Sequence, residues 1–70
     1  MNIDELLLSI DENTHIRRSV LVCFGDDSEK WVEAPSDGSP DYMQDSKLNG
    51  WMEKLYDIGG DVATIGGWIS

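Results

Sequence analysis

The apolar run from His15 to Phe24 most constrains the fold, because its side chains alternate with a period of two. Val, Leu, Val, Cys and Phe in succession are typical of a central strand that has a neighbour on each side. We therefore expect a strand over residues 15–24. One of its faces carries Ile16, Arg18, Val20, Val22 and Phe24, and the other carries Arg17, Ser19, Leu21 and Cys23.

A second strand should pair with the first as a hairpin. Residues 25–28 are all turn-forming types, and residues 29–34 alternate again. Trp31 and Glu33 fall on one face of this second strand, opposite Lys30, Val32 and Ala34. Charged residues on a short strand favour a place at the edge of the sheet.

Two helices are expected around this hairpin. Residues 2–13 show one apolar stripe, with Asn2 as the cap and Glu5 at the third position after it. That stripe consists of Ile3, Leu6, Leu7 and Ile10. The second helix should cover residues 41–58, with Ser39 as its cap and Pro40 as its first residue. Its apolar face would be Leu48, Trp51, Met52, Leu55 and Ile58.

The end of the chain should form a third strand. Gly59-Gly60 is a strong stop for the second helix, and residues 62–65 have strand composition. Gly66-Gly67 indicates a bulge or a turn, after which Trp68 and Ile69 should pack against the core. Asn49-Gly50 is unfavourable inside a helix, and composition leaves open whether the second helix is continuous there.

These elements predict one small α+β domain over residues 1–70, in the order α-β-β-α-β. A right-handed crossover through the second helix places the third strand beside the first. The expected sheet is antiparallel with strand order 2-1-3, and both helices cover one face. The other face, with Arg17, Leu21 and Cys23, should be partly bare or meet a partner.

Charge restricts the partners. Fourteen acidic residues against five basic ones give a net charge of −9. Direct binding to nucleic acid or to an anionic membrane is disfavoured, because both carry negative charge. The charge favours a basic partner, a cation or simple solubility. A lone cysteine, Cys23, and the lack of a signal peptide or an apolar span predict a cytoplasmic protein.

No residue pattern predicts catalysis or a cofactor. His15 has no nucleophile at a useful spacing, and Cys23 fits a structural thiol. One Cys and one His are too few for zinc. The acidic loop of residues 37–45 lacks the spacing of an EF-hand, so that only a weak calcium site is conceivable there. Arg17 and Arg18 either pair with Asp11 and Glu12 or mark a contact point, and the pairing is favoured.

The stretch from Gly25 to Asp45 concentrates negative charge, with Lys30 as its single cation. Four of its acids, Glu33, Asp37, Asp41 and Asp45, recur every fourth residue. Asp41 and Asp45 fall on the predicted second helix, where carboxylates four residues apart stand about 6 Å apart along the axis, and Glu33 and Asp37 lie on the strand and loop before it. A row of this kind can imitate the phosphates of a nucleic-acid strand, which are spaced about 3.4 Å along the duplex axis. With Trp31 and Tyr42 as apolar anchors, the predicted partner-binding residues are Asp26, Asp27, Glu29, Trp31, Glu33, Asp37, Asp41, Tyr42 and Asp45.

A compact acidic domain of this kind, without a catalytic or cofactor motif, resembles the small phage-encoded inhibitors of bacterial defence and host enzymes. DNA-mimic proteins and many anti-CRISPR proteins belong to that class. The resemblance covers the size and charge of the whole chain and involves no sequence motif, and these inhibitors share no common fold. It implies that acidic side chains dock on a basic surface that holds guide RNA or target DNA and compete for it.

Three functions follow as expectations. The first is a non-enzymatic inhibitor that occupies a basic nucleic-acid-binding site on a larger protein or complex, in the cytoplasm of a bacterial host if the gene is phage-encoded. The second is an immunity protein or antitoxin that neutralises a basic toxin. The third is an accessory subunit or homodimer that pairs through Leu21 and Cys23 on the bare sheet face, with a merely solvating acidic surface.

Overall fold

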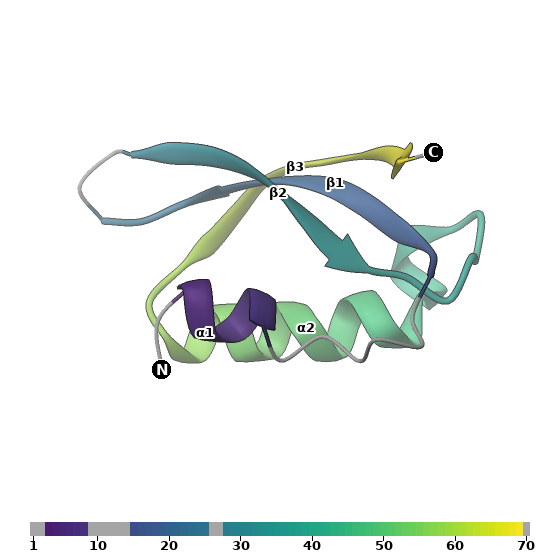
Figure 1. Cartoon of the computed structure of the whole chain (residues 1–70), viewed down its shortest axis with the longest axis horizontal. Coiled ribbons are helices and arrows are strands. Elements are labelled where there is room, and N and C mark those ends of the chain that lie inside the picture. Colours follow the sequence, from purple (N-terminus) through teal and green to yellow (C-terminus); the bar gives the residue numbers. More distant parts are fainter. Residues whose placement is uncertain (1–2, 9–14, 26–27, 70) are drawn as a thin grey trace.

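The computed structural model describes residues 3–8, 15–25 and 28–69 (Figure 1). Three strands form one antiparallel sheet in the order β2-β1-β3, and two α-helices lie on one side of it. The predicted α+β fold, with its strand order 2-1-3, is confirmed. The elements are α1 (Ile3–Leu8), β1 (Arg17–Cys23), β2 (Glu29–Pro35), the 3-10 helix η1 (Tyr42–Gln44), α2 (Ser46–Asp57) and β3 (Asp61–Ile69).

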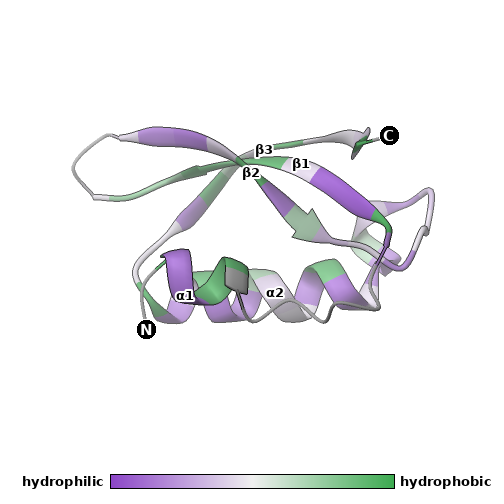
Figure 2. Cartoon of the chain, viewed as in Figure 1, coloured by the Kyte–Doolittle hydropathy of each residue, from purple (hydrophilic) through white to green (hydrophobic). Residues whose placement is uncertain are grey.

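The central strand separates a covered face from an uncovered one. Arg18, Val20 and Val22 are buried on the face that meets the helices, and the residues between them are only half-buried. Residues that pair across an antiparallel ladder share a face, so β1 assigns the faces of both neighbours. We call the side toward the helices the inner face and the opposite side the outer face. In Figure 2 the middle of β1 is hydrophobic, whereas the start of β2 is hydrophilic.

The core lies between the inner face and the helices. The apolar positions predicted from the sequence are confirmed for the second helix, where Leu48, Trp51 and Leu55 are buried. Trp51 is only 4% exposed. The buried hydrophobic residues are Leu6, Val20, Val22, Val32, Ala34, Leu48, Trp51 and Leu55.

The second helix begins later than predicted. Ser39 and Pro40 do not cap it, and residues 41–58 are not one helix. Instead η1 precedes α2, and Asp45 separates them in an extended conformation, with φ −77° and ψ 97°. Its side chain accepts a hydrogen bond from the backbone N–H of Leu48, which is the usual role of a helix N-cap. The proline signal at position 40 was misleading because an aspartate five residues later caps better.

Helix α2 is continuous through Asn49 and Gly50. The Asn49 side-chain amide donates to the Met43 carbonyl at 3.0 Å and ties the helix to η1. At the other end the predicted glycine stop is confirmed. Gly59 has a positive φ of 89°, and the N–H groups of Gly59 and Gly60 donate to the carbonyls of Tyr56 and Leu55. This pair of bonds forms a Schellman motif.

Strand β3 is longer than the predicted residues 62–65. It runs from Asp61 to Ile69 and passes through Gly66 and Gly67 without a turn. The predicted bulge is present, because the register with β1 shifts between the pairs Val20–Ile65 and Arg18–Trp68. The extra residue keeps Trp68 on the inner face, opposite Arg18.

The first helix is described over Ile3–Leu8, where Leu6 is fully buried and Ile3 and Leu7 pack against the core. Three of the four predicted stripe residues are therefore confirmed as core-facing. The predicted Asn2 cap, Ile10 and the last helical residues lie outside the described part of the chain. Among the described residues, no helix combines the length and the apolar character needed to cross a membrane.

Candidate functional site on the outer face of the sheet

None of the helices in the described part of the chain lies on the outer face of the sheet (Figure 1). β2 contributes Glu29, Trp31 and Glu33, which are all exposed. Their partners on β1 are Cys23, Leu21 and Ser19, in that order. The same face continues on β3 with Asp61 and Thr64, which are paired with Cys23 and Leu21. The result is an open surface with an apolar centre and carboxylates around it.

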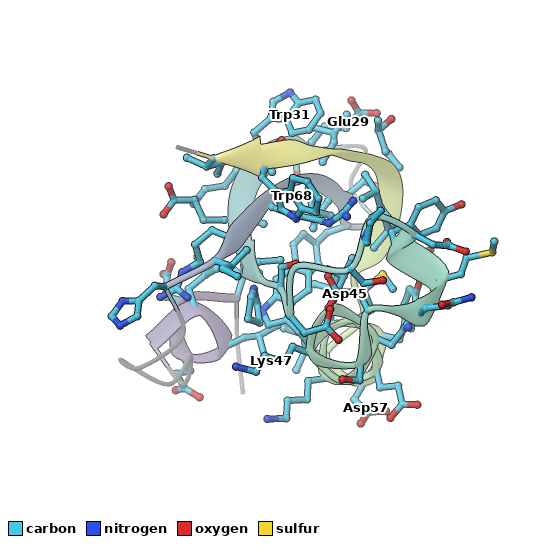
Figure 3. The ribbon with its side chains drawn as sticks, turned by 90° about the vertical axis from the view of Figure 1, so that its right-hand side faces the viewer. Glu29, Trp31, Asp45, Lys47, Asp57 and Trp68 are labelled. Atoms are coloured by element: carbon cyan, nitrogen blue, oxygen red, sulfur yellow. The ribbon has the colours of Figure 1, made fainter. Side chains whose placement is uncertain are left out.

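Trp31 is the largest side chain at this centre. It is 55% exposed and projects away from the helices (Figure 3). Gly66 on β3 leaves room for it: a Cβ added there would lie 3.4 Å from Trp31 Cζ3 and would collide with the Ser19 hydroxyl. The indole therefore extends from β2 across β1 toward β3. The ring is accessible from solvent, and its role as an anchor stays a prediction.

Glu29 and Glu33 flank Trp31 on the same strand face. Alternate residues of a strand lie about 7 Å apart, so each carboxylate stands within side-chain reach of the indole. Both glutamates are exposed, and their carboxylates make no hydrogen bond or ion pair with the described residues. These two carboxylates are therefore available to a partner.

Three further acids of the predicted patch, Asp37, Asp41 and Asp45, lie elsewhere, in the segment of residues 36–48 that we call the capping loop. Asp45 is completely buried, which removes it from any docking surface. Its carboxylate accepts from the Ser36 hydroxyl at 2.5 Å, the Asp37 N–H at 3.0 Å and the Leu48 N–H at 3.0 Å. The prediction that Asp45 binds a partner is wrong, because this carboxylate is buried and accepts hydrogen bonds from donors within the capping loop.

Asp37 and Asp41 also hold the capping loop together. Asp37 accepts from the Ser39 N–H at 2.9 Å and from the N–H and hydroxyl of Ser46 at 3.1 and 3.2 Å. The hydrogen bond from the Ser39 N–H is the main cause of the lowered pKa of Asp37. Asp41 caps η1 through the Met43 N–H at 2.9 Å. Both aspartates reach solvent, but each is engaged by backbone donors.

The four-residue period of the acids therefore forms no continuous row. Glu33 lies on a strand, Asp37 in a loop, and Asp41 and Asp45 are caps of two separate helices. Tyr42, the second predicted anchor, is 44% exposed and belongs to η1 rather than to the outer face. Asp26 and Asp27 fall outside the described residues.

The inner face of the sheet holds the charged side chain of Arg18. Arg18, which is 7% exposed, lies 4.9 Å from the centre of the Trp68 ring and 3.7 Å from the Asp45 carboxylate. It also donates to the Ser39 carbonyl at 2.6 Å. Sequence analysis favoured Asp11 and Glu12 as the partners of the arginines; both acids lie outside the described residues, and within those residues Arg18 pairs with Asp45. The Trp68 indole N–H donates to the Ser36 hydroxyl at 3.3 Å, which anchors Trp68, but Ile69 is exposed and does not pack against the core as predicted.

The remaining candidate residues from the sequence are His15 and Cys23. His15 is exposed, and Cys23 is half-buried on the outer face rather than fully buried. Within residues 3–8, 15–25 and 28–69, no three His, Cys, Asp or Glu side chains group closely enough to hold a metal ion. Sequence reasoning overlooked Asp61, which its register with Cys23 places on the outer face. Comparisons with protein-family models, with curated proteins and with solved structures found no match.

Proposed function

We propose that this chain is a non-enzymatic binding protein that occupies a basic, nucleic-acid-binding surface of a larger protein or complex. The observation that carries the proposal is the open outer face, where Trp31 lies exposed between two carboxylates that have no hydrogen-bond or ion-pair partner among the described residues. An aromatic anchor within a polar rim is the usual composition of a protein-binding hot spot. The inhibitors that the chain resembles in size and charge also act by occupying a basic surface that binds nucleic acid.

The charge of the outer face favours a foreign, cationic partner over a second copy of the chain. Glu29, Glu33 and Asp61 share this face with one cation, Arg17, by strand register. A two-fold dimer brings the same patch of both copies together, so the three acids of each copy would face each other. Like charges at an interface weaken association, whereas a basic surface gains from the same array. The homodimer expectation is therefore the weaker one.

The spacing of the outer-face acids suits a surface that binds phosphates. Glu29 and Glu33 lie four residues apart on one face of β2, about 14 Å along the strand, which is about four phosphate steps of 3.4 Å along a duplex. A rigid strand holds them at that spacing without the entropy cost of ordering a flexible tail. We place the mimicry on β2, and not on the full row of acids from Glu33 to Asp45.

The test begins with affinity capture from a bacterial lysate at low salt, followed by identification of the captured protein and measurement of its affinity. The variant Glu29→Gln/Glu33→Gln should weaken binding by about tenfold or more and reduce its salt dependence. Glu53→Gln/Asp57→Asn removes the same charge from exposed positions of α2 and is the matched control. Equal losses in both variants, or no loss in the first, would contradict the proposal.

The captured partner also separates the inhibitor from the antitoxin function. A nuclease, polymerase or guide-RNA complex whose nucleic-acid binding is blocked supports the first. A basic toxin without such a binding site supports the second. The identity of the partner is needed to separate the two functions, because both use the same electrostatic attraction. Sedimentation of the isolated chain addresses the homodimer: a concentration-dependent dimer that Trp31→Ala abolishes would favour self-association through the outer face.

A further inference from the structure

We infer that the outer face binds one arginine side chain of its partner, stacked on Trp31 and paired with Glu29 or Glu33. This inference rests on the proposed function and specifies the group that the partner supplies. The proposed partner is a protein with an exposed arginine. The inference depends on the similar sets of side chains on the two faces of the sheet and on the negative charge of the outer face.

The inner face shows how this sheet binds a guanidinium. Arg18 lies over the Trp68 ring at 4.9 Å, with the Asp45 carboxylate 3.7 Å from its Nε. Attraction by the ring and the charge of the carboxylate act on the same group. Tryptophan, arginine and carboxylate thus form one set, in which the chain supplies all three members.

The outer face supplies two members of the same set. Trp31 provides a ring that is 55% exposed, and Glu29 and Glu33 provide carboxylates about 7 Å along the strand on either side. In the described part of the chain, the cation stacked on an indole is Arg18 on Trp68, and Trp31 has no such partner. Figure 3 shows the two tryptophans on opposite sides of the sheet, Trp68 toward Asp45 and Trp31 away from the helices.

Neighbouring bases of the chain do not fill this position. Lys30 is next to Trp31 on β2, but alternation directs it to the inner face. Arg17 is on the outer face opposite Pro35, four residues along β2 from Trp31 and beyond Glu33. The third member of the set must therefore come from another molecule.

Arginine fits better than lysine. Its guanidinium is planar and weakly hydrated, so that it can stack on an indole and still donate paired hydrogen bonds to a carboxylate. An ammonium group is a compact, strongly hydrated point charge that gains less from the ring. Basic nucleic-acid-binding grooves contain both residues, so this preference is a property that can be measured separately from overall charge attraction.

The experiment titrates the full chain with two capped peptides, hexaarginine and hexalysine, and follows the indole N–H signals by nuclear magnetic resonance. The chain has three Trp, and the signal missing from the Trp31→Leu spectrum identifies residue 31. We expect hexaarginine to bind about three- to tenfold more tightly and to shift the Trp31 signal most. Trp31→Leu should abolish this preference, and Trp31→Phe should retain part of it.

Tyr56→Leu is the matched control, because it removes an aromatic ring of similar exposure, 49%, from α2. It should leave the arginine preference unchanged. Equal affinities for both peptides, with both weakened by Glu29→Gln/Glu33→Gln, would overturn the arginine site and leave the proposed function intact. Failure of both peptides to bind, or binding that is unaffected by Glu29→Gln/Glu33→Gln and by Trp31→Leu, would overturn the two together.

Discussion

The capping loop and the outer face contain the same kinds of residue and use them differently. In the capping loop, Asp37, Asp41 and Asp45 accept hydrogen bonds from backbone N–H groups, and beside the loop Trp68 of β3 covers the buried Arg18 of β1. On the outer face, Glu29 and Glu33 have no described partner and Trp31 is open to solvent. The difference teaches that an acidic run in a sequence does not identify a docking surface until its local hydrogen bonds are known.

The physical cause is the geometry of the backbone. β2 is an edge strand whose N–H groups either pair with β1 or point sideways in the plane of the sheet, whereas its outer-face side chains stand perpendicular to the sheet and meet no backbone donors. A loop that leads into a helix leaves several N–H groups without carbonyl partners, and short acidic side chains satisfy them. Aspartates of residues 37–45 are therefore structural, and glutamates of β2 remain available.

Asp45→Ala should have the largest effect in this comparison. It removes the α2 cap and leaves Arg18 as a buried charge, which costs about 3–5 kcal/mol. A domain of this size rarely has more than about 3–5 kcal/mol of stability, so we expect the variant to be mostly unfolded at room temperature. Urea denaturation followed by circular dichroism measures the loss.

Glu33→Ala is the outer-face control for that experiment and should change stability by less than about 0.5 kcal/mol. The double variant Arg18→Met/Asp45→Asn keeps a capping side chain and removes both charges. It should recover much of the stability that Asp45→Ala loses. If Asp45→Ala and Glu33→Ala unfold at similar urea concentrations, the two regions do not differ as described.

The two exposed tryptophans provide the next largest contrast. Trp68 is 51% exposed, yet it stacks on Arg18 and donates to Ser36, so Trp68→Leu should destabilise the fold by about 1–2 kcal/mol. Trp31 has a similar exposure and no such polar partner, so Trp31→Leu should cost less than about 0.5 kcal/mol. Thermal unfolding of both variants measures the difference, and a reversed order would show that Trp31 supports the fold.

The smallest effect concerns the acid limb of stability. Hydrogen bonds hold the pKa of Asp37 below its ordinary value of 3.8, so its ionised form contributes stability above that pH. This contribution disappears as the pH falls through the lowered pKa. The stability difference between the wild type and Asp37→Asn should therefore shrink as the pH is lowered below 3.8. Urea midpoints at neutral and acidic pH measure this, and a constant difference would show that the Asp37 charge does not matter.

Much of the fold could be predicted from the sequence, because its signals are local. Alternation identified both faces of β1, the apolar stripe identified Leu48, Trp51 and Leu55, and Gly59-Gly60 marked the end of α2. The start of α2 was mispredicted because Ser39-Pro40 and Asp45 both carry capping signals. Only the contacts of Asp45 with Ser36 in the same loop and with Arg18 on the distant strand β1 decide between them.

The candidate site was less accessible to sequence reasoning. Glu29, Trp31 and Glu33 were correctly placed on one exposed strand face, since alternation is a local property. Their separation from Asp37, Asp41 and Asp45 was not visible, because residue type and spacing do not show which carboxylates accept backbone hydrogen bonds. Asp61 joined the outer face through a register that two irregularities in β3 determine.

By itself the sequence determined the periodicity of each element, the total charge and the antiparallel topology, since these depend on neighbouring residues and short connections. Only the tertiary structure decided which carboxylates accept hydrogen bonds from the chain itself and which, among the described residues, do not. The Asp45 carboxylate, for example, pairs with Arg18 of β1 and accepts hydrogen bonds from Ser36 and Asp37 of the loop, and only folding brings these groups together. Long-range proximity is set by the packing of the whole chain, and no local pattern encodes it.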